Sequence, residues 1–255
     1  MNLSVLADGL ARAKAEDSAI QKQYLSYIAE ARKMPVEAIE MADGIFIPND
    51  QYLVEFCGAR VKEEDFGCYV GDNCVWNNFL IFPVRDIAGN TVGVAGFDPL
   101  VYLENKETGN YENNYYSYSN KFVFQKGYYV YCPHDDFNHA LDDRYLVVID
   151  GLFDAISLSY AGFNAAALMG SVLTPQILMQ LRLIDRIVLI ADNDEAGFKL
   201  YNELRKHLPN VVLVKQGKAK DADELLKSEH GEQFVKKLKD VIHNGVLPIE
   251  TLNFF

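Results

Sequence analysis

The chain has 255 residues with 36 acidic and 24 basic side chains, so its formal net charge is −12. Apolar residues make up 49% and aromatic residues 12%, a composition typical of globular domains rather than of disordered chains. A chain of this length buries roughly 70–75% of the surface that its unfolded form exposes, so it needs no disulfide or metal to stay folded. Because Lys and Arg make most contacts to nucleic acid phosphates, the acidic excess argues at first against nucleic acid binding.

The cysteines and the hydropathy pattern indicate the cellular setting. The four cysteines, Cys57, Cys68, Cys74 and Cys132, form no C-x-x-C pair. Their spacing fits no zinc ribbon and predicts buried, reduced thiols, so no structural zinc is expected. The N-terminus lacks the apolar core of a signal peptide, and no stretch approaches the ~20 apolar residues of a membrane span. The sequence therefore predicts a cytoplasmic protein without a membrane partner.

The N-terminal part mixes helical and strand patterns. Apolar residues at helical spacing predict helices over residues 18–41, interrupted before Pro35. From about residue 69 the chain is rich in Val, Phe and Tyr, with turn signals such as Ala88-Gly89-Asn90. This composition, with its turn signals, predicts short strands at Phe79–Val84, Thr91–Phe97 and Phe122–Tyr131. We therefore expect a mixed α+β subdomain over residues 1–143.

From residue 146 onward, short apolar runs alternate with helical patterns. Strands are expected at Leu146–Ile149, Ala165–Leu168, Arg186–Ala191 and Val211–Val214, with helices at Phe153–Ala161, Thr174–Leu183 and Ala196–His207. Fully apolar runs such as VVI and IVLI indicate strands that are covered on both faces, which is typical of a parallel sheet in an α/β fold. An α/β domain is therefore expected over residues 144–235, followed by a helical tail over residues 236–255.

Acidic residues follow three of these expected strands. They are Asp150 and Asp154 after the first, Asp192 and Asp194 after the third, and Asp221 and Asp223 after the last. Ligands of open α/β sheets bind outside the carboxyl ends of the strands, and gathered carboxylates need a counter-charge such as Mg²⁺. A site of this kind suits phosphoryl or nucleotidyl transfer. Any single pair is better explained as helix N-caps, but three clusters at three strand ends favour a metal site.

Four short motifs, three of them acidic, resemble the successive motifs of a TOPRIM domain. They are residues 150–155 (DGLFDA), 169–171 (MGS), 191–197 (ADNDEAG) and 220–226 (KDADELL), and they are most similar to those of bacterial-type (DnaG-like) DNA primases. Residues 28–42 (IAEARKMPVEAIEMA), 79–86 (FLIFPVRD), 89–96 (GNTVGVAG) and 124–127 (FQKG) resemble the elements that precede TOPRIM in those primases. The resemblance spans roughly residues 20–235. It implies a TOPRIM fold, a Rossmann-like and mostly parallel sheet with flanking helices, after an α+β subdomain.

The resemblance also implies an activity, namely metal-dependent synthesis of short RNA primers on a single-stranded DNA template from ribonucleoside triphosphates. Asp150 falls at the family's catalytic glutamate and Asp154 at the accompanying acidic position, so Asp150, Asp154 and Asp192 are the expected catalytic residues. The expected ligands of two or more Mg²⁺ or Mn²⁺ ions are Asp150, Asp192, Asp194, Asp221 and Asp223. The basic residues expected to contact the nucleotide or the template are Arg85, Lys121, Lys126 and Lys220.

The chain departs from the family pattern at several positions. Asp150 replaces a glutamate, and losing one methylene displaces its carboxylate by on the order of 1 Å. Phe97-Asp98 and Asn114 stand where the family has basic residues. The family's zinc-binding and helicase-binding modules have no counterpart, which predicts a minimal core of phage or plasmid type. It would act in a bacterium or a phage-infected host cell, with a replicative helicase or another replication protein as partner. Two alternatives stay open: a TOPRIM metal-dependent nuclease, and a non-catalytic replication accessory that binds DNA or helicase.

Overall fold

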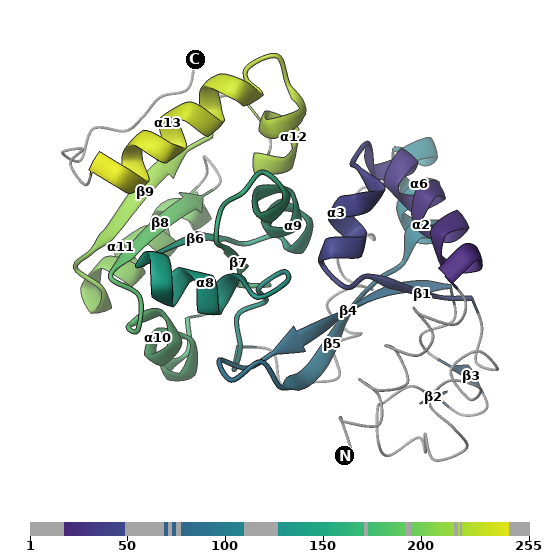
Figure 1. Cartoon of the computed structure of the whole chain (residues 1–255), viewed down its shortest axis with the longest axis horizontal. Helices are drawn as coiled ribbons and strands as arrows, with labels where there is room; N and C mark the ends of the chain where they lie inside the picture. Colours follow the sequence, from purple (N-terminus) through teal and green to yellow (C-terminus); the bar gives the residue numbers. More distant parts are fainter. Residues whose placement is uncertain are drawn as a thin grey trace. The chain divides into compact units, whose positions relative to one another are not determined.

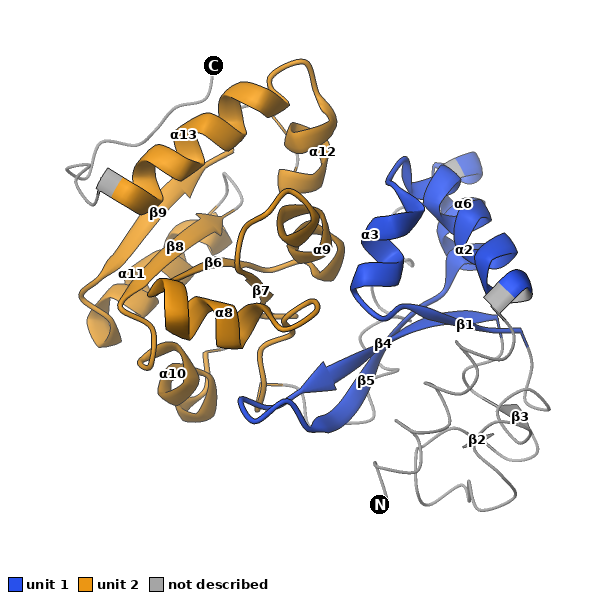
Figure 2. Cartoon of the chain, in the orientation of Figure 1, with its two compact units in different colours: residues 1–125 blue, residues 126–255 orange. Residues whose placement is uncertain are grey.

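The chain forms two compact units, residues 1–125 and 126–255 (Figure 2). The computed structural model describes residues 18–48, 69–70, 73–74, 78–109, 127–170, 173–191, 195–216, 219 and 221–244. The boundary expected between residues 143 and 144 lies inside the second unit, because helix α8 (Asp136–Asp143) packs on strands β6 (Tyr145–Ile149) and β7 (Ala165–Ala167). The exact limits of the domains stay a prediction.

The first unit contains a three-stranded antiparallel sheet with the order β1-β4-β5. Its elements are α2 (Ser18–Arg32), α3 (Val36–Met41), β1 (Ile45–Ile47), β2 (Tyr69–Val70), β3 (Asn73–Cys74), β4 (Phe79–Arg85), β5 (Thr91–Phe97) and α6 (Pro99–Thr108). The helical break expected before Pro35 is confirmed, because Pro35 is the N-cap of α3. The turn between β4 and β5 is fixed by Asp86, whose Oδ1 accepts hydrogen bonds from the backbone N–H groups of Ala88 and Asn90.

The core of this unit lies between its helices and its sheet. Helix α2 packs against α3 and β1, and Ile28, Ile39 and Leu80 are at most 1% exposed. One buried polar side chain joins helix to strand: Gln21 donates from Nε2 to the Phe46 carbonyl at 2.7 Å and accepts the Phe46 N–H at Oε1 at 2.9 Å. The Gln21 side chain thus satisfies both backbone polar groups of the buried Phe46.

The second unit is built on a four-stranded parallel sheet with the order β7-β6-β8-β9 (Figure 1). Beyond α8, β6 and β7, its elements are α9 (Leu152–Tyr160), α10 (Pro175–Leu181), β8 (Arg186–Ala191), α11 (Glu195–His207), β9 (Val211–Lys215), α12 (Ala222–Lys227) and α13 (Gly231–Asn244). Each strand and helix expected from residue 146 onward is present within two residues of its expected ends, apart from the tail helix, α13, which begins earlier. The expected tail residues 245–255 lie outside the described part of the chain. The α/β fold class, with a mixed α+β part before it, is confirmed.

Helices cover both faces of the parallel sheet, which explains the fully apolar strands. Leu146 and Val148 of β6 belong to a buried cluster that also includes residues of α8, α10 and α11. Val147 and Ile149 alternate with them and are also buried, on the face where α9 packs against β6 and β7. Helix α12 packs in turn against α9 and α13.

Some features differ from what the sequence predicts. In residues 127–131, the described part of the strand expected at Phe122–Tyr131, only Tyr131 pairs, in an isolated bridge with Ala167. Helices α6, α8 and α12 were not anticipated. Cys132 is a free and partly buried thiol, whose pKa is raised by burial and then by the neighbouring carboxylates of Asp136 and Asp135. Within the described part of the chain, no helix is long and apolar enough to cross a membrane.

Candidate active site

The carboxyl edge of the parallel sheet contains a topological switch point. Strand β6 pairs with β7 on one side and with β8 on the other, so the chain reverses its direction of travel across the sheet between these strands. Loops diverge at such a point and leave a crevice outside the strand ends, where open α/β sheets bind ligands. Asp150 directly follows β6, and Asp192 follows β8. Two of the expected site residues therefore flank the switch point in the chain.

Asp150 is held by the backbone of the loop that follows β7. Its Oδ1 accepts a hydrogen bond from the Gly170 N–H at 2.8 Å, and its carbonyl accepts one from the Met169 N–H at 3.0 Å. Both donor residues have positive φ angles, 55° for Met169 and 154° for Gly170. The residue itself is exposed at the sheet edge, and within the described residues Oδ2 has no hydrogen-bond partner.

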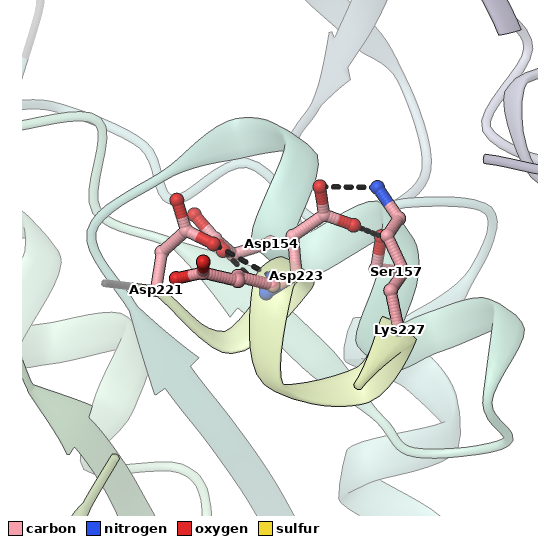
Figure 3. A network of polar contacts seen from close by, with 6 residues as sticks. Asp154, Ser157, Asp221, Asp223 and Lys227 are labelled. Atoms are coloured by element: carbon pink, nitrogen blue, oxygen red, sulfur yellow. Dashed lines mark hydrogen bonds and ion pairs between the residues drawn. The ribbon is translucent and has the colours of Figure 1, made fainter. Parts of the chain in front are cut away.

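Asp154 and Asp221 cap the first turn of α12. Asp221 is the N-cap and accepts the Glu224 N–H at 2.8 Å, while Asp154, from α9, accepts the Asp223 N–H at 2.9 Å (Figure 3). Carboxylates suit this place because the N–H groups of a first helical turn lack partners within the helix and carry partial positive charge. Gly151 makes the arrangement possible, since a Cβ there would lie 2.2 Å from Oδ2 of Asp154.

Asp223 is buried, with 7% of its surface exposed, and both of its carboxylate oxygens bind protein groups. Oδ1 accepts a hydrogen bond from the Ser157 hydroxyl of α9 at 2.5 Å, and Oδ2 pairs with Nζ of Lys227 at 2.5 Å (Figure 3). This carboxylate therefore joins α12 to α9. In this arrangement both carboxylate oxygens of Asp223 are engaged by protein groups, whereas only Oδ1 of Asp150 accepts a hydrogen bond from the described residues.

The structure brings only part of the expected site together. Asp154, Asp221 and Asp223 gather around the first turn of α12, while Asp150 lies at the end of β6. Among the described residues, no group of three or more His, Cys, Asp or Glu side chains could hold a metal ion. The remaining expected residues lie outside the described part of the chain: Asp192, Asp194, Lys121, Lys126 and Lys220.

The basic side chains of the described residues differ from the expected set. Arg85, in the first unit, is paired with Asp43 at 2.6 Å. Lys215, which the sequence reasoning missed, ends β9 opposite Ala191, the residue immediately before Asp192. Its Nζ lies 4.4 Å from the ring centroid of Phe198, a favourable position over an aromatic face. The sequence signal that could have identified Lys215 is its place at the end of an apolar strand, where it is the first basic residue after that strand begins.

Comparison with known proteins identifies the second unit. A family model described as Toprim-like matches residues 147–226. The chain contains a Toprim-like domain. This match covers β6 through most of α12 and so includes Asp150, Asp154, Asp221 and Asp223.

Curated relatives extend the similarity upstream of the Toprim-like domain. A DNA primase of Geobacillus stearothermophilus is 29% identical over 187 residues, which cover 71% of this chain and 29% of that primase. A DNA primase of Rickettsia bellii is 32% identical over 144 residues, or 54% of this chain and 21% of the relative. The chain thus spans less than a third of the length of either relative.

The fold is similar to that of solved primase cores. The DnaG primase catalytic domain bound to ssDNA superimposes with a TM-score of 0.65 at 20% identity, covering 91% of this chain and 81% of that chain. Because this coverage includes both units, the α+β part also has the DnaG catalytic-core fold. Residues 147–226 are therefore Toprim-like, and the fold of the chain resembles that of the catalytic core of DnaG-type primases.

Proposed function

We propose that the chain acts as the catalytic core of a DNA primase, which synthesises short RNA primers on single-stranded DNA from ribonucleoside triphosphates during DNA replication. The observation that carries this proposal is the position of Asp150 and of the D-x-D motif, which follow the two strands at the switch point of the Toprim-like sheet. Similarity to curated DNA primases and to the fold of a DnaG domain bound to ssDNA supports the same activity.

The donor atoms at this edge suit a hard divalent cation. Carboxylate oxygens are the ligands that Mg²⁺ and Mn²⁺ prefer, and Asp150 is an exposed residue whose hydrogen bond to Gly170 uses only Oδ1. We propose Asp150, Asp192, Asp194 and Asp221 as the residues that would hold Mg²⁺ or Mn²⁺. When bound, such cations supply charge neutralisation for the triphosphate and activation of the attacking 3′-hydroxyl.

The two remaining acidic residues, Asp154 and Asp223, have positioning roles in this proposal. Because the Asp223 carboxylate is engaged by Ser157 and Lys227, we propose that Asp223 positions α12 and thereby its N-cap, Asp221, instead of binding the cation directly. Asp154 has the same role through the Asp223 N–H. Both residues would then affect catalysis by keeping Asp221 at the sheet edge.

Basic side chains would bind the nucleotide and the template. Lys215 is a candidate for a triphosphate contact because it stands beside the residue that precedes Asp192. Lys121, Lys126 and Lys220 stay proposals for the same role. Arg85 must exchange its ion pair with Asp43 to contact a phosphate, so its contribution should be weaker than that of an unpaired arginine.

Primer synthesis tests the proposal. The protein is incubated with single-stranded template, Mg²⁺ or Mn²⁺ and labelled ribonucleotides, in parallel with Asp192→Ala, Asp194→Ala and the matched control Asp142→Ala. Asp142 is an exposed carboxylate on α8, which precedes the amino end of β6, whereas Asp150 follows the carboxyl end of that strand. We expect template-dependent oligomers from the wild type and from the control, and none from the other two variants.

The other outcomes have clear meanings. Oligomers that persist in both Asp192→Ala and Asp194→Ala would refute synthesis at this site. Shortened template in the presence of the cation would indicate a nuclease, in which the same carboxylates serve to activate water. Measurable DNA binding without any product would indicate an accessory without catalysis.

A further inference from the structure

We propose that the Met169–Gly170 turn is a positioning device for Asp150, adapted to aspartate in place of the longer glutamate. In this arrangement the Gly170 amide fixes Oδ1 and leaves Oδ2 directed at the ligand side of the sheet edge. The inference rests on the proposed function, since it concerns the same site. Gly170 is the positioning residue, acting through its backbone N–H.

Three successive amides of the loop after β7 donate to the end of β6. The Leu168 N–H binds the Ile149 carbonyl at 2.8 Å, and the Met169 N–H binds the Asp150 carbonyl at 3.0 Å. The next amide, that of Gly170, binds the Asp150 side chain instead, at 2.8 Å. Hydrogen bonding between the two chain segments thus continues beyond the last ladder pair, Ile149 opposite Ala167, and ends on the carboxylate.

The backbone of the turn is shaped for this third contact. Met169 has a φ of 55° and Gly170 a φ of 154°. A left-handed conformation costs a residue with a Cβ on the order of 1 kcal/mol, and residues held in this way concentrate at functional sites. Burial of the Met169 side chain, which is 7% exposed, offsets that cost and holds the turn in place.

Side-chain length decides whether the contact can form. The Asp150 carboxylate reaches the Gly170 N–H with one methylene between it and its own backbone. A glutamate would carry the carboxylate about 1.5 Å farther from the same backbone, past the amide. An aspartate at position 150 is therefore compatible with a functional site. The turn holds this shorter side chain where the resembling family has a glutamate.

The first test measures the contact itself and does not depend on activity. In a ¹H–¹⁵N spectrum, the Gly170 amide proton is expected at low field because it donates to a carboxylate. In Asp150→Ala and Asp150→Glu it should move to higher field, while the Gly162 amide stays in place. A Gly170 amide proton that does not respond to either substitution would refute the contact.

The second test measures the consequence of the contact. Asp150→Glu and Gly170→Ala are each expected to lower kcat for primer synthesis by about tenfold or more, with the KM for nucleotides changed by less than about twofold. Both should also weaken Mn²⁺ binding measured by calorimetry. Gly162→Ala is the matched control, since Gly162 also has a positive φ, 87°, and lies in the turn after α9, where a Cβ meets nothing within 4 Å.

The outcomes separate this inference from the proposed function. A variant Asp150→Glu that is as active as the wild type or more so would overturn the inference, and so would a Gly162→Ala variant that loses as much activity as Gly170→Ala. If Gly170→Ala fails to fold, Asp150→Glu decides alone. If the wild type makes no primer, the proposed function fails, while the amide shift and the Mn²⁺ affinities still test the positioning of Asp150.

Discussion

Asp136 is a buried carboxyl group outside the candidate active site, at the start of α8. Its Oδ2 accepts the Ala165 N–H of β7 at 2.9 Å, and the Ser159 hydroxyl of α9 also binds it. Burial, together with a smaller contribution from Asp135, raises the pKa of Asp136 to about 7, although the two hydrogen bonds and the nearby His139 lower it. Its charged form is therefore unfavourable in the folded state.

The raised pKa predicts a stability that falls as pH rises. The folded state binds this proton more tightly than the unfolded chain, in which Asp titrates near 3.9, so ionisation costs stability progressively between about pH 4 and pH 7 and a constant amount above. Asp136→Asn retains an acceptor for the Ala165 N–H and removes the charge. Relative to the wild type, its free energy of unfolding should increase by about 3–4 kcal/mol between pH 4 and pH 8.

Urea denaturation at both pH values measures this difference. Asp142→Asn is the matched control, because it removes the same charge from an exposed position of α8. Its stability difference from the wild type should be the same at both pH values. A difference for Asp136→Asn that is independent of pH would show that Asp136 is ionised at little cost.

At the scale of elements, α12 depends on contacts with α9 because it is only six residues long. Isolated helices of this length do not form in water, so its caps and its buried ion pair must hold it. The side chains of the pair are largely buried, with 10% of Asp223 and 27% of Lys227 exposed. Removing one partner of such a pair leaves an uncompensated buried charge.

Two lysine substitutions test the importance of that burial. Lys227→Met is expected to lower the free energy of unfolding by about 2–3 kcal/mol, and adding Asp223→Asn should recover most of the loss. Lys206→Met is the control, since its pair with Glu203 has the same 2.5 Å separation but lies at the surface of α11, where the stability should not change. Equal effects of the two lysine substitutions, in urea denaturation with EDTA present, would contradict the structural role of Asp223.

The elements that the sequence predicts best are those with strong periodicity. Leu146–Ile149 and Arg186–Ala191 are continuous apolar runs, and the structure buries them on both faces, as such runs require. Helix α8 escaped prediction because four of its eight residues are Asp or Asn, and the burial of Asp136 depends on packing against β7 and α9. The start of helix α6 is marked in the sequence by Asp98 as N-cap and Pro99 at the first helical position, a signal that the sequence analysis does not use.

The sequence predicts where Asp150 lies but not which carboxylates the protein itself engages. Asp150 directly follows strand β6, as expected, whereas Asp221 is the N-cap of α12. The pair between Asp223 and Lys227 follows an i, i+4 spacing that is visible in the sequence. The contact of Asp223 with Ser157 joins residues 66 positions apart, so it depends on how α12 packs on α9 and no local pattern predicts it. The hydrogen bond from the Gly170 amide to Asp150 joins residues 20 positions apart, so no local pattern predicts it either.

At the scale of the whole molecule, the charge is unevenly distributed between the halves of the sequence. Residues 1–145 contain 22 acidic and 12 basic side chains, whereas residues 146–255 contain 14 and 12. Bound divalent cations would cancel the small excess of the second half but not the net charge of −10 of the first. A template that contacts the N-terminal half therefore meets few cationic side chains.

We accordingly expect the isolated chain to bind single-stranded DNA weakly and in a salt-sensitive manner. Each phosphate neutralised by Lys or Arg contributes about −0.7 to the slope of log K against log salt on single strands, so three or four contacts give a slope of about −2 to −3. Fluorescence anisotropy of a labelled oligonucleotide between low and physiological salt measures that slope, and Mg²⁺ should strengthen binding relative to EDTA at equal ionic strength. A replication partner that supplies basic surface should raise the affinity further. Tight binding that does not change with salt would contradict this expectation, because it would require a template contact that does not depend on phosphate charge.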